Sequence, residues 1–72
     1  MDIKRRFGLA VRARRAALGI SQEELALRID ADQAYVSRVE AGAMNVTLET
    51  AQQIAQALGT DVALLFSGAP AA

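Results

Sequence analysis

The stretch Ser21–Gly42, SQEELALRIDADQAYVSRVEAG, has the pattern of two short helices joined by a tight turn. Its first helix starts at a capping box, in which the Ser21 oxygen accepts a free backbone amide and Glu24 reaches back to the amide of Ser21. The turn falls at Asp30, a residue type that tolerates a left-handed backbone better than most. Asp32 is placed to cap the second helix. We expect the rest of the chain to support this pair of helices.

The second helix of the pair is predicted over about residues 33–41, with Gly42 ending it. Val36 and Val39, spaced i to i+3, are its only clear core residues, so its other faces are left for another role. The inner face of the first helix is formed by Leu25, Ala26 and Ile29.

Three further helices flank the pair. An amphipathic helix from Ile3 to Leu18 precedes it, and Gly19 supplies the left-handed residue that ends such a helix. Thr47 caps a fourth helix that ends at Gly59, and a short fifth helix is predicted over residues 62–66. The first of these has the apolar residues Ile3, Phe7, Val11 and Leu18, with Ala10 and Ala17 beside them, and the fourth has Leu48, Ala51, Ile54, Ala55 and Leu58.

Composition favours an all-α fold, a five-helix bundle. Apolar residues make up 53% of the chain but aromatic residues only 4%, and helix-forming residue types dominate over β-branched ones. We expect one domain over residues 1–72, with an ordered core at about 3–66 and a flexible tail at 67–72. A domain of this size buries roughly 60% of its unfolded surface, and a second copy could supply further burial.

The residue types that are absent exclude several kinds of chemistry. The chain has no Cys and no His, which removes thiolate chemistry, the usual zinc sites and the commonest general base. We therefore expect no enzyme, no metal and no cofactor. The longest apolar runs are about five residues and no secretory signal is recognised, so a cytoplasmic protein without a membrane partner is expected. The acidic residues of the helix pair are better explained as caps and turn residues than as a catalytic pair, namely Glu23, Glu24, Asp30 and Asp32.

Charge is distributed unevenly although the net charge is zero. Residues 1–20 hold six basic side chains and one acidic side chain, whereas residues 21–72 hold two basic and seven acidic. This polarity suggests a local basic face that could meet phosphates, and a merely solvated helix face is the alternative. The basic residues left for this face are Lys4, Arg5, Arg6, Arg12 and Arg14.

Several parts of the chain form a specific combination: Arg15, LGISQEELA (18–26), VSRVEAG (36–42), IAQALG (54–59) and Leu65-Phe66. The combination resembles the lambda-repressor-like helix-turn-helix domain of the Cro/C1-type repressors (the XRE family) over about residues 5–66. The resemblance implies a sequence-specific transcriptional regulator that binds double-stranded DNA at a palindromic operator as a homodimer.

Within that family, the small size and two short patterns are similar to the controller proteins of restriction-modification systems. The patterns are DQAYVS (32–37), with its Asp32, Tyr35, Val36 and Ser37, and NVTL (45–48). Phage or chromosomal repressors share much of this consensus, as do antitoxins, so contact with RNA polymerase or with a toxin stays open as a partner.

Three residues depart from the family pattern. Asp30 stands where the turn usually has glycine, and Ala31 replaces a larger aliphatic residue, which should loosen the packing of the two helices. Ala34 replaces a polar base-reading residue, so contact with a thymine methyl is its more natural role.

Side chains at the start and on the outer face of the second helix of the pair are expected to read bases in the major groove. Gln33 suits an adenine edge, and Arg38 suits a guanine or a phosphate. The alternative is an ordinary exposed helix surface, and the Tyr35 ring could instead cap the core. The predicted base-reading residues are Gln33, Ala34, Tyr35, Ser37 and Arg38.

Phosphate contacts are expected from three further residues. Gln22 opens a helix whose free amides suit a phosphate, Asn45 resembles the second backbone clamp of the family, and Arg12 belongs to the basic face. The resemblance also implies a structural ion pair between Arg15 and Glu40, which would fix helix orientation more than it adds stability.

The C-terminal helix is the candidate dimer interface. It has more apolar residues than one short helix buries in its own domain, although closure of the core is a competing explanation. The predicted interface residues are Val62, Leu64, Leu65 and Phe66.

Overall fold

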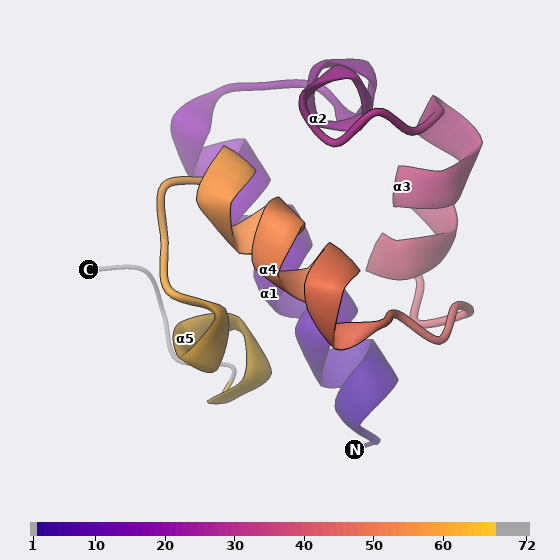
Figure 1. Cartoon of the computed structure of the whole chain (residues 1–72), viewed down its shortest axis with the longest axis vertical. Helices are drawn as coiled ribbons and strands as arrows, with labels where there is room; N and C mark the ends of the chain where they lie inside the picture. Colours follow the sequence, from indigo (N-terminus) through magenta and orange to yellow (C-terminus); the bar gives the residue numbers. More distant parts are fainter. Residues whose placement is uncertain (1, 68–72) are drawn as a thin grey trace.

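The computed structural model describes residues 2–67 as five helices joined by short turns (Figure 1). The predicted all-α fold is therefore confirmed. α3 packs on α1 and α2, and α5 packs on α1 and α4. In residues 2–67 no helix has the length and apolar character needed to cross a lipid bilayer. The helices are α1 (Ile3–Leu18), α2 (Gln22–Arg28), α3 (Gln33–Glu40), α4 (Leu48–Ala57) and α5 (Val62–Ser67).

Each of the first four helices starts at a side chain that accepts a hydrogen bond from a free backbone amide. The Ser21 Oγ accepts from the Glu24 amide at 3.0 Å, and the Asp32 Oδ1 accepts from the Tyr35 amide at 2.8 Å, as predicted. The Glu24 half of the capping box is not formed, because the Glu24 carboxylate accepts from Arg28 instead. The caps of α1 and α4 are Asp2 and Thr47.

The Asp2 cap also has an electrostatic effect. Its Oδ1 accepts a hydrogen bond from the backbone amide of Arg5 at 3.0 Å, and this bond lowers the pKa of Asp2. The ionised carboxylate is thus the form that begins α1, where the positive end of the helix dipole favours a negative charge.

The turn between α2 and α3 has an unusual backbone. Asp30 has a φ of 56°, in the left-handed region, as the sequence predicted. The amide of Ala31 returns to the Ala26 carbonyl at 2.9 Å and closes the turn. An aspartate at this position therefore preserves the turn that glycine makes more easily.

The core is formed mainly by the predicted apolar faces. Within residues 2–67, eleven buried apolar side chains from all five helices and the end of α4 make one cluster, with Leu25, Val11 and Leu58 fully enclosed. Leu48 was expected in this cluster but is 80% exposed, although Ala51 in the same turn of α4 is buried. Ile3 and Leu18, at the two ends of α1, are exposed as well.

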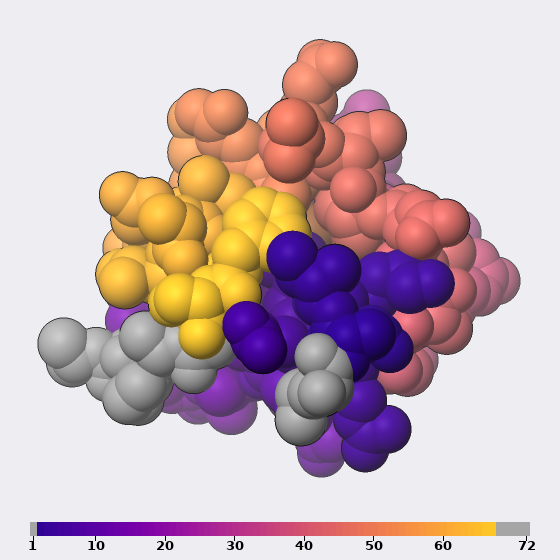
Figure 2. All heavy atoms as spheres, turned by 90° about the horizontal axis from the view of Figure 1, so that it is seen from below, coloured from indigo at the N-terminus to yellow at the C-terminus, as the bar shows by residue number. Residues whose placement is uncertain are grey.

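α5 closes one end of the core. Its Leu65 is buried, and the ring of Phe66 lies 4.8 Å from the ring of Phe7 between centroids. Figure 2 shows α5 beside the start of α1, with α4 adjoining it. Ser67, predicted as the first residue of the tail, belongs to α5, and residues 68–72 of that predicted tail lie outside the described part of the chain.

α1 and α3 meet through backbone atoms at Gly8. A Cβ atom built on Gly8 would lie 2.7 Å from the carbonyl oxygen of Glu40, and closer still to that of Val39. No side chain fits between the two helices at this point. The absence of a side chain at Gly8 therefore sets how closely α3 approaches α1.

Replacing Gly8 with alanine tests this contact. Gly8→Ala should lower the free energy of unfolding by about 1–3 kcal/mol, since the new methyl group must displace backbone. The loss opposes the gain of about 1 kcal/mol that alanine brings to a helix interior. Urea denaturation would measure it. The exposed Ala13→Gly change on the same helix gives the propensity baseline, and a Gly8→Ala protein as stable as the parent would contradict the close contact.

Candidate nucleic-acid interface

α3 has two faces with different roles. Successive residues are rotated by about 100° around a helix, so Val36, Val39 and Glu40 share one side and Ala34 and Arg38 lie opposite. The first three are buried and the last two are exposed. The inner side holds α3 on the domain, and the outer side is left available to a ligand.

Three other predicted base-reading residues lie at the edges of that outer face. Gln33 is exposed and lies on the same edge as the half-buried Ser37, one turn later. Tyr35 is half-buried on the opposite edge, where it packs against the core. The geometry therefore brings Gln33, Ala34, Ser37 and Arg38 together and sets Tyr35 apart as a packing residue.

An ion pair joins α1 to the inner side of α3. Arg15 Nε lies 2.7 Å from Glu40 Oε2, and Arg15 Nη2 donates to Glu40 Oε1 at 3.1 Å. The hydrogen bond with Glu40 raises the pKa of Arg15, so the guanidinium stays charged. Glu40 is only 7% exposed, and it is the one buried charged residue within residues 2–67.

The ion pair continues into a chain of side-chain hydrogen bonds. Gln22 Nε2 donates to Glu40 Oε1 at 3.0 Å, and Gln33 Nε2 donates to Gln22 Oε1 at 2.6 Å. Arg15 also donates from Nη1 to the Ile20 carbonyl at 2.9 Å. The side-chain amide of Gln22, predicted as a phosphate donor, is thus engaged with Glu40 and Gln33 and links α2 to α3.

Two basic residues of α1 border α3. Arg5 and Arg12 are seven residues apart and lie on the side of α1 next to Gly8. The backbone of Arg5 also lies against the turn that follows α3, where a Cβ built on Gly42 would be 2.9 Å from the Arg5 Cα. Asn45 is exposed in the loop between α3 and α4. This side of the domain combines positive charge with the outer face of α3.

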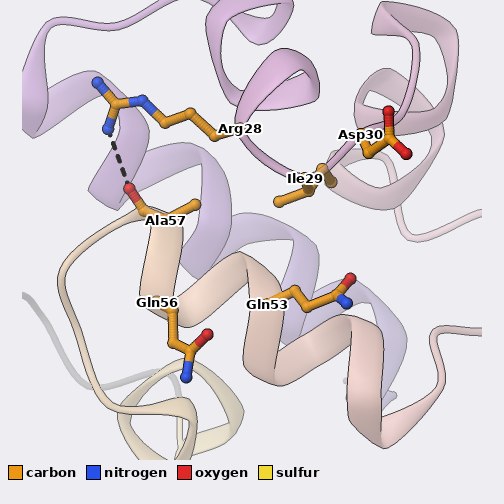
Figure 3. A pocket seen from close by; sticks show the side chains of 6 residues that line it. All are labelled: Arg28, Ile29, Asp30, Gln53, Gln56 and Ala57. Carbon is orange, nitrogen blue, oxygen red and sulfur yellow. Dashed lines mark hydrogen bonds between the residues drawn. The ribbon is translucent and has the colours of Figure 1, made fainter.

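Arg14 has a different role from the one predicted for it. Its Nε donates to the Leu58 carbonyl at 2.9 Å and its Nη2 to the Gly59 carbonyl at 3.3 Å. Arg28, from α2, donates from Nη1 to the Ala57 carbonyl at 3.0 Å (Figure 3). The two arginines thus satisfy the last carbonyl of α4 and the two that follow it, at the end where the helix dipole favours positive charge.

An open pocket of about 530 Å³ lies beside this contact, between the end of α2 and α4. Figure 3 shows Arg28 at one side of it and Asp30 at the other, with two glutamines on α4 below. It includes none of the predicted DNA-contacting residues. Its lining consists of Arg28, Ile29, Asp30, Gln53, Gln56 and Ala57.

Sequence patterns alone did not reveal three of these features. Gly8 could have been noticed in the sequence, because an isolated glycine lowers the stability of a helix and its presence inside one often indicates a close packing contact. The contacts of Gln22 with Glu40 and of Arg14 with α4 join segments far apart in the chain, and no local pattern marks them.

Comparison with known proteins agrees with this geometry. Residues 11–65 match the helix-turn-helix family. The chain belongs to the Cro/C1-type helix-turn-helix family. It is 40% identical over 67 residues to the control protein C.MunI of Mycoplasma sp, covering 92% of this chain and 90% of that protein.

Two solved structures are similar as well. The restriction-modification controller protein C.AhdI from Aeromonas hydrophila superposes with a TM-score of 0.82 at 40% identity, covering 86% of this chain and 90% of that one. The clp gene regulator ClgR from Corynebacterium glutamicum gives a TM-score of 0.91 at 29% identity, covering 94% and 72%. The chain is accordingly a helix-turn-helix DNA-binding regulator whose relatives include controller proteins.

Removing the buried carboxylate should loosen α3. Glu40→Ala leaves the Arg15 guanidinium without its partner, and the free energy of unfolding should fall by about 3 kcal/mol. Thermal denaturation would show a lower melting temperature, and affinity for specific DNA should fall as well.

Glu24→Ala is the matched control, because it removes an equal charge from an exposed i,i+4 pair with Arg28. That pair should contribute at most about 0.5 kcal/mol. Equal stability of the Glu40→Ala and Glu24→Ala proteins would show that the Arg15–Glu40 pair does not hold α3 in place.

Proposed function

We propose that this protein regulates transcription by binding a palindromic operator as a homodimer, with α3 in the major groove. The observation that carries the proposal is the division of α3 into a buried inner side and an exposed outer face. The outer face presents Gln33, Ala34, Ser37 and Arg38, while the inner side is held by Glu40. In this proposal the protein acts by binding DNA and not by catalysis.

The bases would be contacted by three kinds of group. Gln33 offers an amide, Arg38 offers guanidinium donors for a guanine or a phosphate, and Ala34 offers a methyl group to a thymine. Arg12, Asn45 and the backbone amide end of α2 at Gln22 would hold phosphates and set the register on the duplex. The kinship with C.MunI and C.AhdI favours a controller-type regulator over other members of the family.

A dimer follows from the small size of one reading surface. One helix touches only a few base pairs, whereas a two-fold dimer reads two half-sites about 34 Å apart. Of the predicted interface residues, Leu65 is 3% exposed and belongs to the core of its own domain. Leu64 is 49% exposed, with the half-buried Val62 and Phe66 on the same helix, so Leu64 is the proposed centre of the interface.

Selection of bound sequences from random duplex DNA tests the proposed function. We expect enrichment of a two-fold symmetric sequence whose half-sites are centred about 34 Å, or one helical turn, apart. The Gln33→Ala protein should lose the preference at one position of each half-site while it keeps the remaining pattern. Enrichment of no sequence at all would refute operator binding.

Salt dependence separates the arginines that contact phosphate from those that contact protein. Arg12→Gln should reduce the slope of log affinity against log salt by about one per protomer, because one counterion fewer is released. Its stability should be unchanged. Arg14→Gln should instead lower the free energy of unfolding by about 1–2 kcal/mol, since the Leu58 and Gly59 carbonyls after α4 lose their donor. If both variants changed only the salt slope, the assignment of Arg14 to α4 would be wrong.

A charge at the proposed interface should prevent dimerisation. Leu64→Asp places a carboxylate in each half of a symmetric apolar contact, so sedimentation should show monomers where the parent forms dimers. The control is Leu27→Asp on α2, which is 76% exposed and outside the interface. A parent protein that stays a 7.6 kDa monomer at tens of micromolar, both free and on DNA, would exclude the dimer.

A further inference from the structure

We propose that Glu40 determines which base Gln33 reads, by fixing the direction of the hydrogen bonds that run from Arg15 through Gln22. The inference rests on the proposed DNA-binding function. It assigns a role in sequence specificity to Glu40 and Gln22, which do not themselves contact bases. Its basis is the unbroken chain of contacts Arg15, Glu40, Gln22 and Gln33, with successive distances of 2.7, 3.0 and 2.6 Å.

The direction of the chain originates at the carboxylate. An ionised carboxylate only accepts hydrogen bonds, and Arg15 holds Glu40 in this form with donors on both oxygens. Because Glu40 is buried, water has little access to these oxygens. Whatever faces Glu40 Oε1 from α2 must therefore be a donor, which requires Gln22 to turn its NH2 group toward Glu40.

This requirement passes on to Gln33. With its NH2 group on Glu40, Gln22 presents its carbonyl oxygen to Gln33, and Gln33 must donate to it. One N–H of Gln33 is then used inside the protein. The remaining N–H and the Oε1 atom form a side-by-side donor and acceptor at the start of the outer face of α3.

That pair of groups matches one base in particular. Adenine presents an acceptor at N7 and a donor at N6 in the major groove, which complement the free N–H and Oε1 of Gln33. Guanine presents two acceptors, N7 and O6. The Oε1 atom of Gln33 is also an acceptor, so it could form no hydrogen bond with either of them. A glutamine free to rotate its amide could offer both N–H groups to guanine, so the restriction comes from the chain and not from glutamine itself.

Glu40→Gln should reverse the chain. The carbonyl of the new amide keeps the shorter of the two Arg15 bonds, the one from Nε, so its NH2 group replaces Oε1 and faces Gln22, at the loss of the bond from Arg15 Nη2. Gln22 then accepts from residue 40 and donates to Gln33 Oε1. Both N–H groups of Gln33 become free, which is the arrangement that guanine accepts.

The experiment compares two duplexes that differ only at the position read by Gln33, located as the position where Gln33→Ala loses its preference. Equilibrium binding is measured for the parent with adenine or guanine at that position in both half-sites. The parent should favour adenine by about tenfold or more. In Glu40→Gln this ratio should fall about tenfold or reverse in favour of guanine.

Two further variants make the result interpretable. Glu24→Gln removes the same charge from an exposed site outside the chain and should leave the adenine-to-guanine ratio unchanged. Gln22→Ala keeps the Arg15–Glu40 pair but frees Gln33, so its ratio should fall toward one even if Glu40→Gln does not fold. Loss of affinity for both duplexes alike, with an unchanged ratio in Gln22→Ala and Glu40→Gln, would overturn the proposal and leave Glu40 a purely structural role.

A measurement without DNA separates failure of this inference from failure of the proposed function. In the free parent protein, NMR should show one side-chain N–H proton of Gln33 protected from exchange, and Gln22→Ala should remove the protection. If the parent selects no DNA sequence but the protection is present, the proposed function fails and the hydrogen-bond direction stands. If neither Gln33 proton is protected, the chain is absent and the inference fails.

Discussion

The arrangement of the first three helices depends on one buried carboxylate. Glu40 sits on the inner side of α3, receives Arg15 from α1 and Gln22 from α2, and so joins all three helices at one point. Burying a charge is costly unless its hydrogen bonds are satisfied, and within residues 2–67 no buried side-chain nitrogen or oxygen lacks a partner. Such a site adds little net stability, but it penalises any other orientation of α3, because a shift would leave the charge unpaired.

Backbone contact and charge placement complete this arrangement. Gly8 lets α1 touch α3 directly, while Arg14 and Arg28 hold the end of α4 from α1 and α2. Three of the eight basic side chains, counting Arg15, are therefore engaged within the domain. The positive charge on the side proposed to face DNA therefore comes from fewer residues than the composition suggests, and a net charge of zero need not weaken a local phosphate contact.

The sequence predicted the helices well because their boundaries have local causes. Caps such as Ser21, Asp32 and Thr47, and the left-handed Asp30, act within a few residues of where they stand. The sequence predicted the exposure of apolar residues less well: Leu48 has the spacing of the buried face of α4 but is 80% exposed. Periodicity gives the direction of a side chain, whereas its burial depends on where other helices end.

The candidate site shows the same limit. The Arg15–Glu40 pair was implied by the family resemblance, and the outer position of Ala34 and Arg38 followed from helical spacing. The engagement of Gln22 with Glu40 and of Arg14 with α4 could not be derived, because each depends on the distance between helices in the folded chain. Arginine and glutamine side chains are long enough to serve either DNA or protein, and only tertiary structure decides between these partners.

The backbone contact at Gly8 also bears on how a regulator of this kind can acquire new targets. Since no side chain lies between α1 and α3 at that point, side chains on the outer face of α3 do not enter this contact. Substitutions at Ala34 or Arg38 alter the surface offered to a duplex without repacking the domain. Gln33 is the exception, because its amide is tied to Gln22, so divergence at the first position of α3 requires a compensating change in α2. The fold thus divides the proposed reading surface into residues that can vary independently and one, Gln33, whose changes must be matched at Gln22.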